Sequence, residues 1–570
     1  MTEPSAPIAE NPPASRAARI GWVILIVATL YVCYFSHLGA IGFVGPDEPR
    51  YAWIARDMAE TGVWVTPRLY GKPWFEKPPL FYWAAAASFK LFGVSEAAAR
   101  LPSAISALLA TLALAWLALR LYGAETARWL LLLLPTTVGM IGFSHAAATD
   151  MPFSAMLTIA MVCAAVVLGL TRNEHTPILP HTPWLALILF GFFLGAAVLA
   201  KGPAAIILSG GAVFFWALFT KRWRDAFRLL HPVAIASFCL TALPWYFLCA
   251  RRNPDFFRIF IIEHNFKRYL TSEFQHVQPF WFYLPVLLLT FLPWTGALLW
   301  ATIVGSAQIL KRKKVSPHLL FLLSWSLFAV LFFTISKSKL PGYILPVVPA
   351  LALLLARSCG SLAIERRKSF GVSLAVFALA FVIASALIVK LLPHTPWPTR
   401  QMQFGLSFVF GMIAMANTIL AAAFLWDGDR WKLNQVALLC VVPMLFAFMI
   451  ADKPLAGVDL LSSKGLAIKL LAQRVPPDHT FVYGGMGRSF RYGLNFYLER
   501  EVLDWDKNPN GEAYVLSGSG SGRCANLKTQ GFNCTDVPLG SSFPGWFVSH
   551  VTPKSSVDSL SGSGQPQQEK

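Results

Sequence analysis

Apolar runs long enough for a helix to cross a lipid bilayer follow one another along most of this sequence of 570 residues. A membrane-spanning helix needs about 17 to 25 mostly apolar residues, and we count about thirteen candidate runs. They lie near 20–40, 103–119, 129–143, 152–170, 183–200, 204–220, 231–250, 281–303, 318–335, 343–356, 370–391, 404–426 and 434–451. Because 56% of the residues are hydrophobic and 14% are charged, an ordinary soluble domain is excluded. The sequence predicts a polytopic α-helical membrane protein.

The first apolar run follows Arg16 and Arg19 and resembles a secretion signal at first sight. It is about twenty residues long and has no clear cleavage site with small residues. We therefore interpret it as a signal anchor that the protein retains.

Basic residues are distributed unevenly between alternate loops. If residues 1–20 face the cytoplasm, the segments on the same side are 120–128, 171–182, 221–230, 304–317, 357–369 and 427–433. These seven segments hold 19 Lys or Arg against 8 Asp or Glu, as the preference for positive charge on the cytoplasmic side predicts. We interpret the basic runs as topology anchors. They account for much of the net charge of +19 without a nucleic acid partner.

The region after about Ala451 is less apolar and, with an odd number of spans, lies on the extracytoplasmic side. We divide the chain into a transmembrane domain, 1–451, and a small α/β domain, 452–570, with a disordered tail. Segments that read as strands are 480–485, 512–517 and 545–551, and segments that read as helices are 463–475 and 489–500. An extracytoplasmic compartment permits a disulfide, and we predict one between Cys524 and Cys534.

The first extracytoplasmic loop, 43–102, contains several polar groups close to the end of a span. Asp47 is placed to cap a helix, and Gly62 is placed to end it. On that helix Asp47, Arg50 and Tyr51 are spaced i, i+3, i+4, so an acid, a guanidinium and a phenol share one face. An apolar element at 80–93 is too short to cross a bilayer, so we expect interfacial helices in this loop.

A proline-rich stretch, GKPWFEKPPLFYW, lies between these two elements. Pro78 and Pro79 favour extended backbone before them, so Glu76 and Lys77 are displayed from a stiff segment. A lysine held in this way suits an anionic headgroup. The alternative is a lysine that merely extends to the membrane interface beside aromatic residues, and this stretch alone leaves both interpretations open.

Isolated charges also mark the extracytoplasmic ends of later spans. Asp150 begins one span, where a simple helix cap is the alternative interpretation. Lys201 ends another span, contrary to the positive-inside preference, and two later loops contribute His264 and Tyr343. Two acids and several cations at one membrane face are what a site for a lipid-linked phosphate needs.

Six stretches together resemble one known family. They are GPDEPRYAWIARDM, GKPWFEKPPLFYW, AARLPSA, Asp150 before Met-Pro, AKGP and SKSKLPGYILP. The sequence is similar through them to the bacterial aminoarabinose transferases, which belong with the protein O-mannosyltransferases among the GT-C glycosyltransferases. The resemblance covers nearly the whole chain. It implies a GT-C fold with about thirteen transmembrane helices and a periplasmic C-terminal α/β domain. The implied activity is transfer of 4-amino-4-deoxy-L-arabinose from undecaprenyl phosphate to lipid A, at the periplasmic side of the bacterial inner membrane.

The resemblance also implies roles for single residues. Asp47 and Asp150 match two acidic positions that face the reaction centre. The residues that match positions around the donor phosphate are Arg50, Tyr51, Lys77, Lys201 and Tyr343. Glu76 and His264 look like ligands of a divalent metal ion, with zinc favoured, although two ligands are too few to define a site. Pro49 departs from the family, which usually has a small residue there.

The role of the carboxylates depends on the acceptor. A hydroxyl acceptor needs a general base, and Asp47 could take its proton, whereas a phosphate acceptor needs little deprotonation. In the second case Asp47 would position the acceptor or the sugar amine, or stabilise positive charge on the sugar ring. The sequence leaves this choice open.

Two alternatives to the lipid A reaction stay open at this stage. One is a related transferase with another sugar, or with a protein or glycan acceptor. The other is a lipid or saccharide transporter, which would also need many spans, although transporters usually show related halves and no repeat is obvious here. We further expect a monomer without a nucleotide cofactor.

Overall fold

The structure of the protein is a computed structural model that describes residues 16–171, 183–267, 277–311, 315–360, 366–391, 400–425, 462–483, 486–505, 511–518, 524–537, 539 and 546–553. Its N-terminal helices are α1 (Arg16–Tyr34), α2 (Asp47–Thr61), α3 (Leu80–Phe92), α4 (Glu96–Tyr122), α5 (Ala124–Leu133), α6 (Val138–Ser144), α7 (Asp150–Val167), α8 (Trp184–Lys201), α9 (Ala204–Thr220), α10 (Trp223–Phe227) and α11 (Pro232–Arg252). They are followed by α13 (Tyr283–Thr290), α14 (Thr295–Lys311), α15 (Pro317–Ile335), α16 (Val348–Gly360), α18 (Arg367–Leu391) and α19 (Arg400–Leu425). Short 3-10 or π segments are η1 (Arg228–Leu230), η2 (Arg258–Lys267), η3 (Phe280–Phe282) and η4 (Pro341–Val347).

The predicted apolar runs from 20–40 to 404–426 each coincide with a helix or with two successive helices. Within the residues that the structure describes, seven helices are long and apolar enough to cross a membrane, or up to nine if each bent pair is one span. The run at 434–451 and the predicted domain boundary near 451 lie outside the described residues. The number of spans and the domain boundary therefore stay predictions.

Two of the predicted runs are sharply bent rather than straight. The run at 129–143 is divided into α5 and α6, whose axes differ by 63°, and the run at 281–303 is divided into two helices whose axes differ by 118°. Pro135 and Pro293 lie at these breaks, where proline removes a backbone donor and cannot continue the preceding helix. Hydropathy reports the apolar character of such a run but not its bend.

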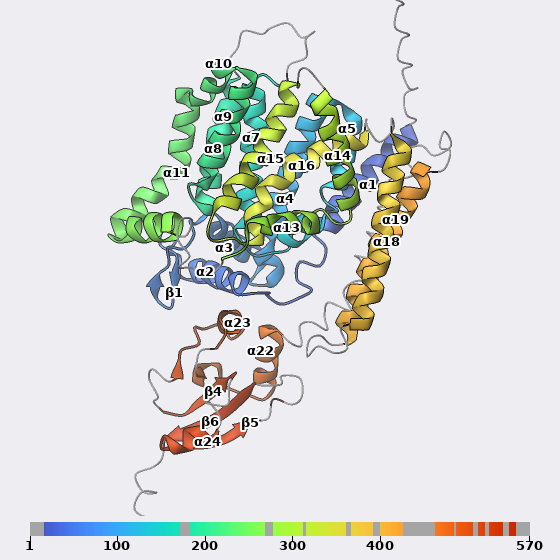
Figure 1. The fold of residues 1–570 in the computed structure, drawn as a ribbon. Coiled ribbons are helices and arrows are strands. Elements are labelled where there is room, and N and C mark those ends of the chain that lie inside the picture. Colours follow the sequence, from blue (N-terminus) through green and yellow to red (C-terminus); the bar gives the residue numbers. More distant parts are fainter. Residues whose placement is uncertain are drawn as a thin grey trace, which may run out of the picture.

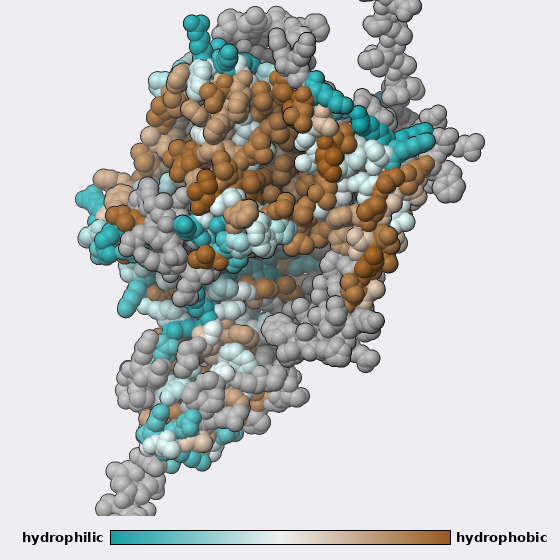
Figure 2. Space-filling view, viewed as in Figure 1, coloured by the Kyte–Doolittle hydropathy of each residue, from teal (hydrophilic) through white to brown (hydrophobic). Residues whose placement is uncertain are grey.

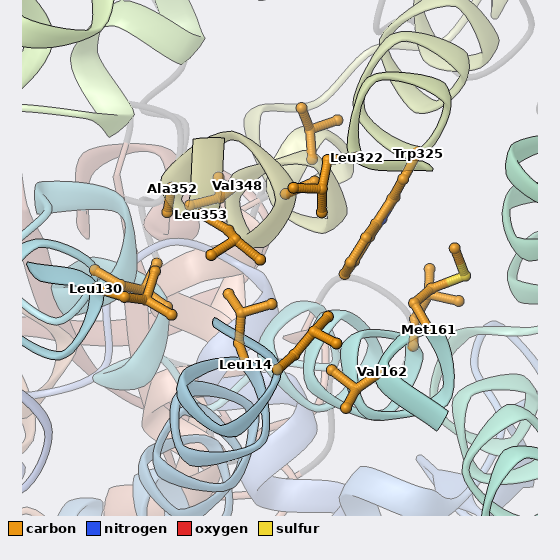
Figure 3. Packing of buried hydrophobic residues seen from close by; sticks show 14 of the residues in the cluster. Leu114, Leu130, Met161, Val162, Leu322, Trp325, Val348, Ala352 and Leu353 are labelled. Atoms are coloured by element: carbon orange, nitrogen blue, oxygen red, sulfur yellow. The ribbon is translucent and has the colours of Figure 1, made fainter. Parts of the chain in front are cut away.

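The core of the bundle is a continuous cluster of apolar side chains. Figure 3 shows side chains of this cluster pointing into the space between the helices, among them Leu114 of α4, Leu130 of α5, Met161 of α7, Trp325 of α15 and Leu353 of α16. On the face of the bundle that Figure 2 shows, apolar side chains form a broad band, with hydrophilic residues at its ends. An apolar exterior on an apolar core is the pattern of a protein that has lipid as its solvent.

Helices α2 and α3 lie across one end of the bundle, and the basic segment that contains α10 lies at the other end (Figure 1). Helix α2 ends where predicted, at Gly62, which adopts a left-handed conformation with φ of 72°. The prediction that Asp47 caps this helix was wrong, because Pro46 occupies the capping position and Asp47 is the first helical residue. Instead, the neighbouring Glu48 reaches back and accepts a hydrogen bond from the Val44 backbone N–H at 2.7 Å.

The described residues after 462 form a small unit of helices and strands below α2 (Figure 1), which is compatible with the predicted α/β domain and which we call the C-terminal unit. Its elements are α22 (Ser463–Ala472), η6 (Pro477–His479), β3 (Thr480–Tyr483), α23 (Arg488–Tyr497), β4 (Ala513–Ser517), α24 (Cys524–Thr529), β5 (Phe532–Val537) and β6 (Phe547–Pro553). The strands form one sheet in the order β3-β4-β6-β5, with β3 and β4 parallel and the other pairs antiparallel. Helix α24 and strand β5 were not predicted. The predicted disulfide between Cys524 and Cys534 is confirmed, and it joins these two elements.

Candidate active site

The polar face of α2 is organised around the guanidinium of Arg50. Its Nη2 atom lies 2.6 Å from Oδ1 of Asp47, one turn earlier, and its Nη1 atom lies 2.9 Å from Oε2 of Glu76. The Arg50 side chain is 5% exposed and that of Glu76 is 11% exposed, whereas that of Asp47 is 50% exposed. The predicted cluster therefore forms, with one carboxylate enclosed and one open to the outside.

Aromatic rings surround the same guanidinium. Its central carbon lies 5.1 Å from the ring centroid of Tyr51, 5.3 Å from that of Trp74 and 5.8 Å from that of Tyr492 in α23. Rings at such distances attract a cation through the negative charge on their faces. Trp74 and Tyr492 were not among the predicted site residues, and aromatic residues are too frequent in this chain for the sequence to single them out.

The electrostatics of this group keep Arg50 charged and Tyr51 neutral. Burial alone would lower the pKa of Arg50, but Tyr51, Glu76 and Asp47 raise it by more, so it stays above its usual value. Burial raises the pKa of Tyr51 well above its usual value, and Glu76 and Asp47 add to this effect. At neutral pH the site therefore holds a permanent cation next to a phenol that can donate a hydrogen bond.

Lys77 belongs to the same group. Its Nζ atom lies 3.8 Å from Oε1 of Glu76, and the residue is 9% exposed, just before the two prolines that precede α3. The lysine is thus held within the protein rather than extended to the membrane interface. This placement favours the first of the two interpretations that the sequence left open.

Asp150, Lys201 and Tyr343 form a second group. The Lys201 Nζ atom donates to Oδ1 of Asp150 at 2.5 Å and lies 4.6 Å from the ring centroid of Tyr343. Gly342 makes this arrangement possible, because a Cβ at that position would clash with Oδ1 of Asp150. Asp150 is not the cap of α7, because Thr149 occupies the capping position and Asp150 is the first helical residue. Its carboxylate instead joins the start of α7 to the end of α8.

A buried ion pair that the sequence analysis missed connects the two groups. The Arg100 Nε and Nη2 atoms donate to the two carboxylate oxygens of Glu48 at 3.1 and 3.0 Å. The remaining donors of Arg100 bind the backbone carbonyls of Leu38, Ile41 and Gly42. Glu48 also accepts a hydrogen bond of 2.6 Å from the Ala147 backbone N–H. Ala147 lies three residues before Asp150, so this pair fixes the start of α2 relative to the start of α7.

The sequence carried a signal for this ion pair. Glu48 and Arg100 both lie in stretches that carry the family resemblance, DEPRY and AARLPSA. Neither residue received a role, because a position more than fifty residues from its partner gives no spacing to interpret. A charged residue at the start of an apolar span, such as Arg100, nevertheless points to a buried partner.

The surroundings of Glu76 bear on the predicted metal ion. Arg50 and Lys77 both lie against its carboxylate, and two cations at that distance disfavour a divalent metal there. Within the described residues, no group of three or more His, Cys, Asp or Glu side chains is arranged to hold a metal. His264 lies in η2, but its side chain lies outside the described part of the chain. The predicted metal site is therefore untested, and we derive no step of the reaction through it.

Known proteins resemble the chain over most of its length. Residues 20–260 match the family described as dolichyl-phosphate-mannose-protein mannosyltransferase. The undecaprenyl phosphate-α-4-amino-4-deoxy-L-arabinose arabinosyl transferase of Erwinia tasmaniensis is 33% identical over 76% of this chain and 74% of its own. The enzyme of the same name from Enterobacter sp. is 32% identical over 78% of this chain and 80% of its own. The chain belongs to this arabinosyl transferase family.

As a member of the arabinosyl transferase family, the chain is a multi-pass membrane glycosyltransferase, which sets aside the transporter alternative. The segment matched to the mannosyltransferases contains every predicted site residue except His264 and Tyr343. The fold is also that of a solved family member. The crystal structure of ArnT from Cupriavidus metallidurans bound to undecaprenyl phosphate has a TM-score of 0.76 at 24% identity, over 93% of this chain and 98% of that one.

Proposed function

We propose that this arabinosyl transferase moves 4-amino-4-deoxy-L-arabinose from undecaprenyl phosphate to lipid A, at the periplasmic face of the bacterial inner membrane. The observation that carries the proposal is the group around Arg50. A permanent cation, a lysine and a neutral phenol converge at the end of the bundle opposite the basic segment that contains α10 (Figure 1). Relatives that carry the aminoarabinose transferase name support the choice of sugar and carrier.

The reaction breaks the bond between the anomeric carbon of the sugar and the phosphate oxygen of the carrier. The electron pair of that bond stays on the phosphate, whose negative charge rises as the carbon departs. Arg50 and Lys77 are fixed cations in a poorly hydrated place, so they stabilise that charge where it develops. Tyr51 supplies a hydrogen bond donor beside them.

The acceptor oxygen forms the new bond to the anomeric carbon. Asp47 is suited to this side of the reaction, because half of its side chain stays exposed while Arg50 holds one of its oxygens. It would orient the acceptor or the sugar amine, or take a proton from a hydroxyl acceptor. We assign Asp150 and Lys201 to the same reaction centre, as a charged pair that Gly342 keeps compact.

One observation favours a second candidate function. The match to protein mannosyltransferases covers the part of the chain that carries α2, α3 and most of the predicted site. A transferase that uses another sugar, or a protein or glycan acceptor, would need the same cations for the same carrier phosphate. The acceptor therefore separates the two candidates.

A divalent metal, with zinc favoured and Glu76 and His264 as ligands, stays a prediction beside this proposal. A metal bound there would neutralise the carrier phosphate, as Arg50 and Lys77 are proposed to do. Treatment of the purified enzyme with a chelator tests this prediction. Loss of turnover would support the metal site, and unchanged turnover would refute it.

Mass analysis of lipid A and of polyprenyl-phosphate sugars tests the proposed function in cells. Host cells that lack their own transferase and express this chain should contain lipid A with the added mass of aminoarabinose. If the host accumulates the carrier-linked sugar and its lipid A stays unmodified, lipid A is not the acceptor. Appearance of the sugar on a protein or glycan would favour the second candidate.

A further inference from the structure

The C-terminal unit is packed directly against the candidate site. Tyr492 and Phe496 of α23 lie in one buried cluster with Tyr51 of α2 and with Phe81 and Tyr82 of α3. Tyr492 is 8% exposed and Phe496 is 4% exposed. The apolar contact surface of α2 is thus completed by a helix from a distant part of the sequence.

Hydrogen bonds fix the same contact at the turn that joins β1 (Arg68–Leu69) to β2 (Lys72–Pro73). The hydroxyl of Tyr70 in this turn accepts from Arg491 Nε at 2.8 Å and from Asn495 Nδ2 at 3.0 Å. Glu501 accepts from the Tyr70 backbone N–H and from Trp53 Nε1. Lys77 lies only seven residues after Tyr70 in this turn. The C-terminal unit therefore fixes the start of the segment that carries Glu76 and Lys77.

Further contacts hold the two units together at the far end of α2. The Arg56 Nη1 atom donates to the Phe496 backbone carbonyl at 3.1 Å, and its Nη2 atom lies 3.3 Å from the Glu499 carboxylate. Nearer the start of α2, the hydroxyl of Ser489 donates to the Gly45 backbone carbonyl at 2.9 Å. The contact therefore spans the length of α2, and α23 has a fixed position over it.

That fixed position places the ring of Tyr492 over Arg50. Two of the three rings around the guanidinium, those of Tyr51 and Trp74, come from the first extracytoplasmic loop that the sequence predicted, and the third is Tyr492. A guanidinium that lost one ring would gain water on that side, and its attraction for a phosphate would weaken as the local dielectric rose. Tyr492 does not need its hydroxyl for this effect, because the ring face is what contacts the cation.

We propose that the C-terminal unit is part of the donor-phosphate site and that Tyr492 is a positioning residue, which holds Arg50 against Asp47 and Glu76 in a water-poor environment. The inference rests on the proposed function, in that the phosphate is taken to be that of the polyprenyl carrier. It adds a residue from outside the transmembrane bundle to the site. It also gives the C-terminal unit a role in recognising the donor.

The test is the dissociation constant of undecaprenyl phosphate for the purified full-length protein and its variants. Tyr492→Ala and Tyr492→Leu should each weaken binding by about tenfold, since both remove the ring that faces Arg50. Tyr492→Phe should bind within about twofold of the unchanged protein, since it keeps the ring. Arg488→Ala is the matched control, because Arg488 is an exposed residue in the first turn of the same helix, and it should bind normally.

The outcomes separate the inference from the proposed function. An unchanged protein that fails to bind undecaprenyl phosphate would refute the proposed function itself. Normal binding by the unchanged protein together with normal binding by Tyr492→Leu would overturn the inference, because leucine preserves the apolar packing and removes only the ring. Equal losses in Tyr492→Leu and Tyr492→Phe would also overturn it. Thermal unfolding of each variant shows whether Tyr492→Ala is folded, and Tyr492→Leu keeps the test decisive if it is not.

Discussion

Arg50 donates to two carboxylates whose surroundings differ, in agreement with the different roles that we propose for them. Glu76 is enclosed between Arg50 and Lys77, so it holds the cations in place. Asp47 contacts Arg50 on one side and keeps half of its side chain exposed, so it can reach a substrate. The helical spacing predicted the contact between Asp47 and Arg50. It could not predict Glu76 as the second partner, because that contact depends on the path of the chain between α2 and α3.

Asp47→Asn should lower turnover by about a hundredfold or more, which corresponds to about 3 kcal/mol on the barrier. Lys77→Ala should do the same, because it removes a positive charge that stabilises the carrier phosphate. Lys311→Ala is the control, since Lys311 is an exposed residue at the end of α14, and it should leave turnover unchanged. The measurement is transfer by purified variants that unfold at the temperature of the unchanged protein.

Gly342→Ala should inactivate the enzyme through the second group. The added methyl group would force the Asp150 carboxylate away from its contact with Lys201. Gly305→Ala is the matched control, because nothing lies within 4 Å of a Cβ at that position in α14. Comparable activity in the two glycine variants would show that the contact between Asp150 and Lys201 is dispensable.

A buried ion pair between Glu48 and Arg100 holds the start of α2 in place. Arg100 satisfies its donors with Glu48 and three backbone carbonyls, and Glu48 in turn holds backbone N–H groups before α2 and before α7. Removing one member of such a pair leaves the other buried without its partner, which is costly. The pair explains how loops far apart in the sequence are kept in one arrangement at the site.

Arg100→Ala should destabilise the folded protein by about 3–5 kcal/mol, which thermal unfolding in detergent would report as a clearly lower midpoint. Arg120→Ala provides the comparison, since Arg120 is an exposed residue at the opposite end of the same helix. A midpoint in Arg100→Ala that equals the midpoint of Arg120→Ala would contradict the structural role given to this pair.

The elements also show what sequence patterns could and could not predict. Apolar runs located α1, α4 to α9, α11, α13 to α16, α18 and α19, and the strand-like runs located β3, β4 and β6. The bends near Pro135 and Pro293 were missed, because an apolar run reads the same whether its helix is straight or broken. Strand β5 was missed because its sequence, FNCTDV, is half polar, and its pairing with β6 is what makes it a strand. Tyr492 was missed because its contact with Arg50 joins parts of the chain more than four hundred residues apart.

The whole molecule has a polar asymmetry that matches its proposed orientation. The basic segment that contains α10 lies at one end of the bundle, and α2, α3 and the C-terminal unit lie at the other (Figure 1). Cytoplasmic ends of membrane proteins are enriched in Lys and Arg. In the proposed orientation, the candidate site and the disulfide between Cys524 and Cys534 both lie on the extracytoplasmic side, where a disulfide is stable.

Topology reporters test this orientation directly. A reporter fused within the C-terminal unit should behave as extracytoplasmic, because α23 packs against the end of the bundle that carries the site. A reporter inserted at 221–230 should behave as cytoplasmic, because that loop carries four basic residues. A cytoplasmic signal from the C-terminal fusion would place the candidate site on the wrong side for a periplasmic acceptor.

Transfer by the purified protein is the decisive measurement of the proposed reaction. The full-length chain in lipid nanodiscs is given undecaprenyl phosphate-linked 4-amino-4-deoxy-L-arabinose and lipid A, and both products are followed by mass spectrometry. We predict lipid A with one added aminoarabinose for each undecaprenyl phosphate released, and loss of both products in Asp47→Asn. Release of undecaprenyl phosphate without modified lipid A, or equal transfer by the unchanged protein and Asp47→Asn, would contradict this prediction.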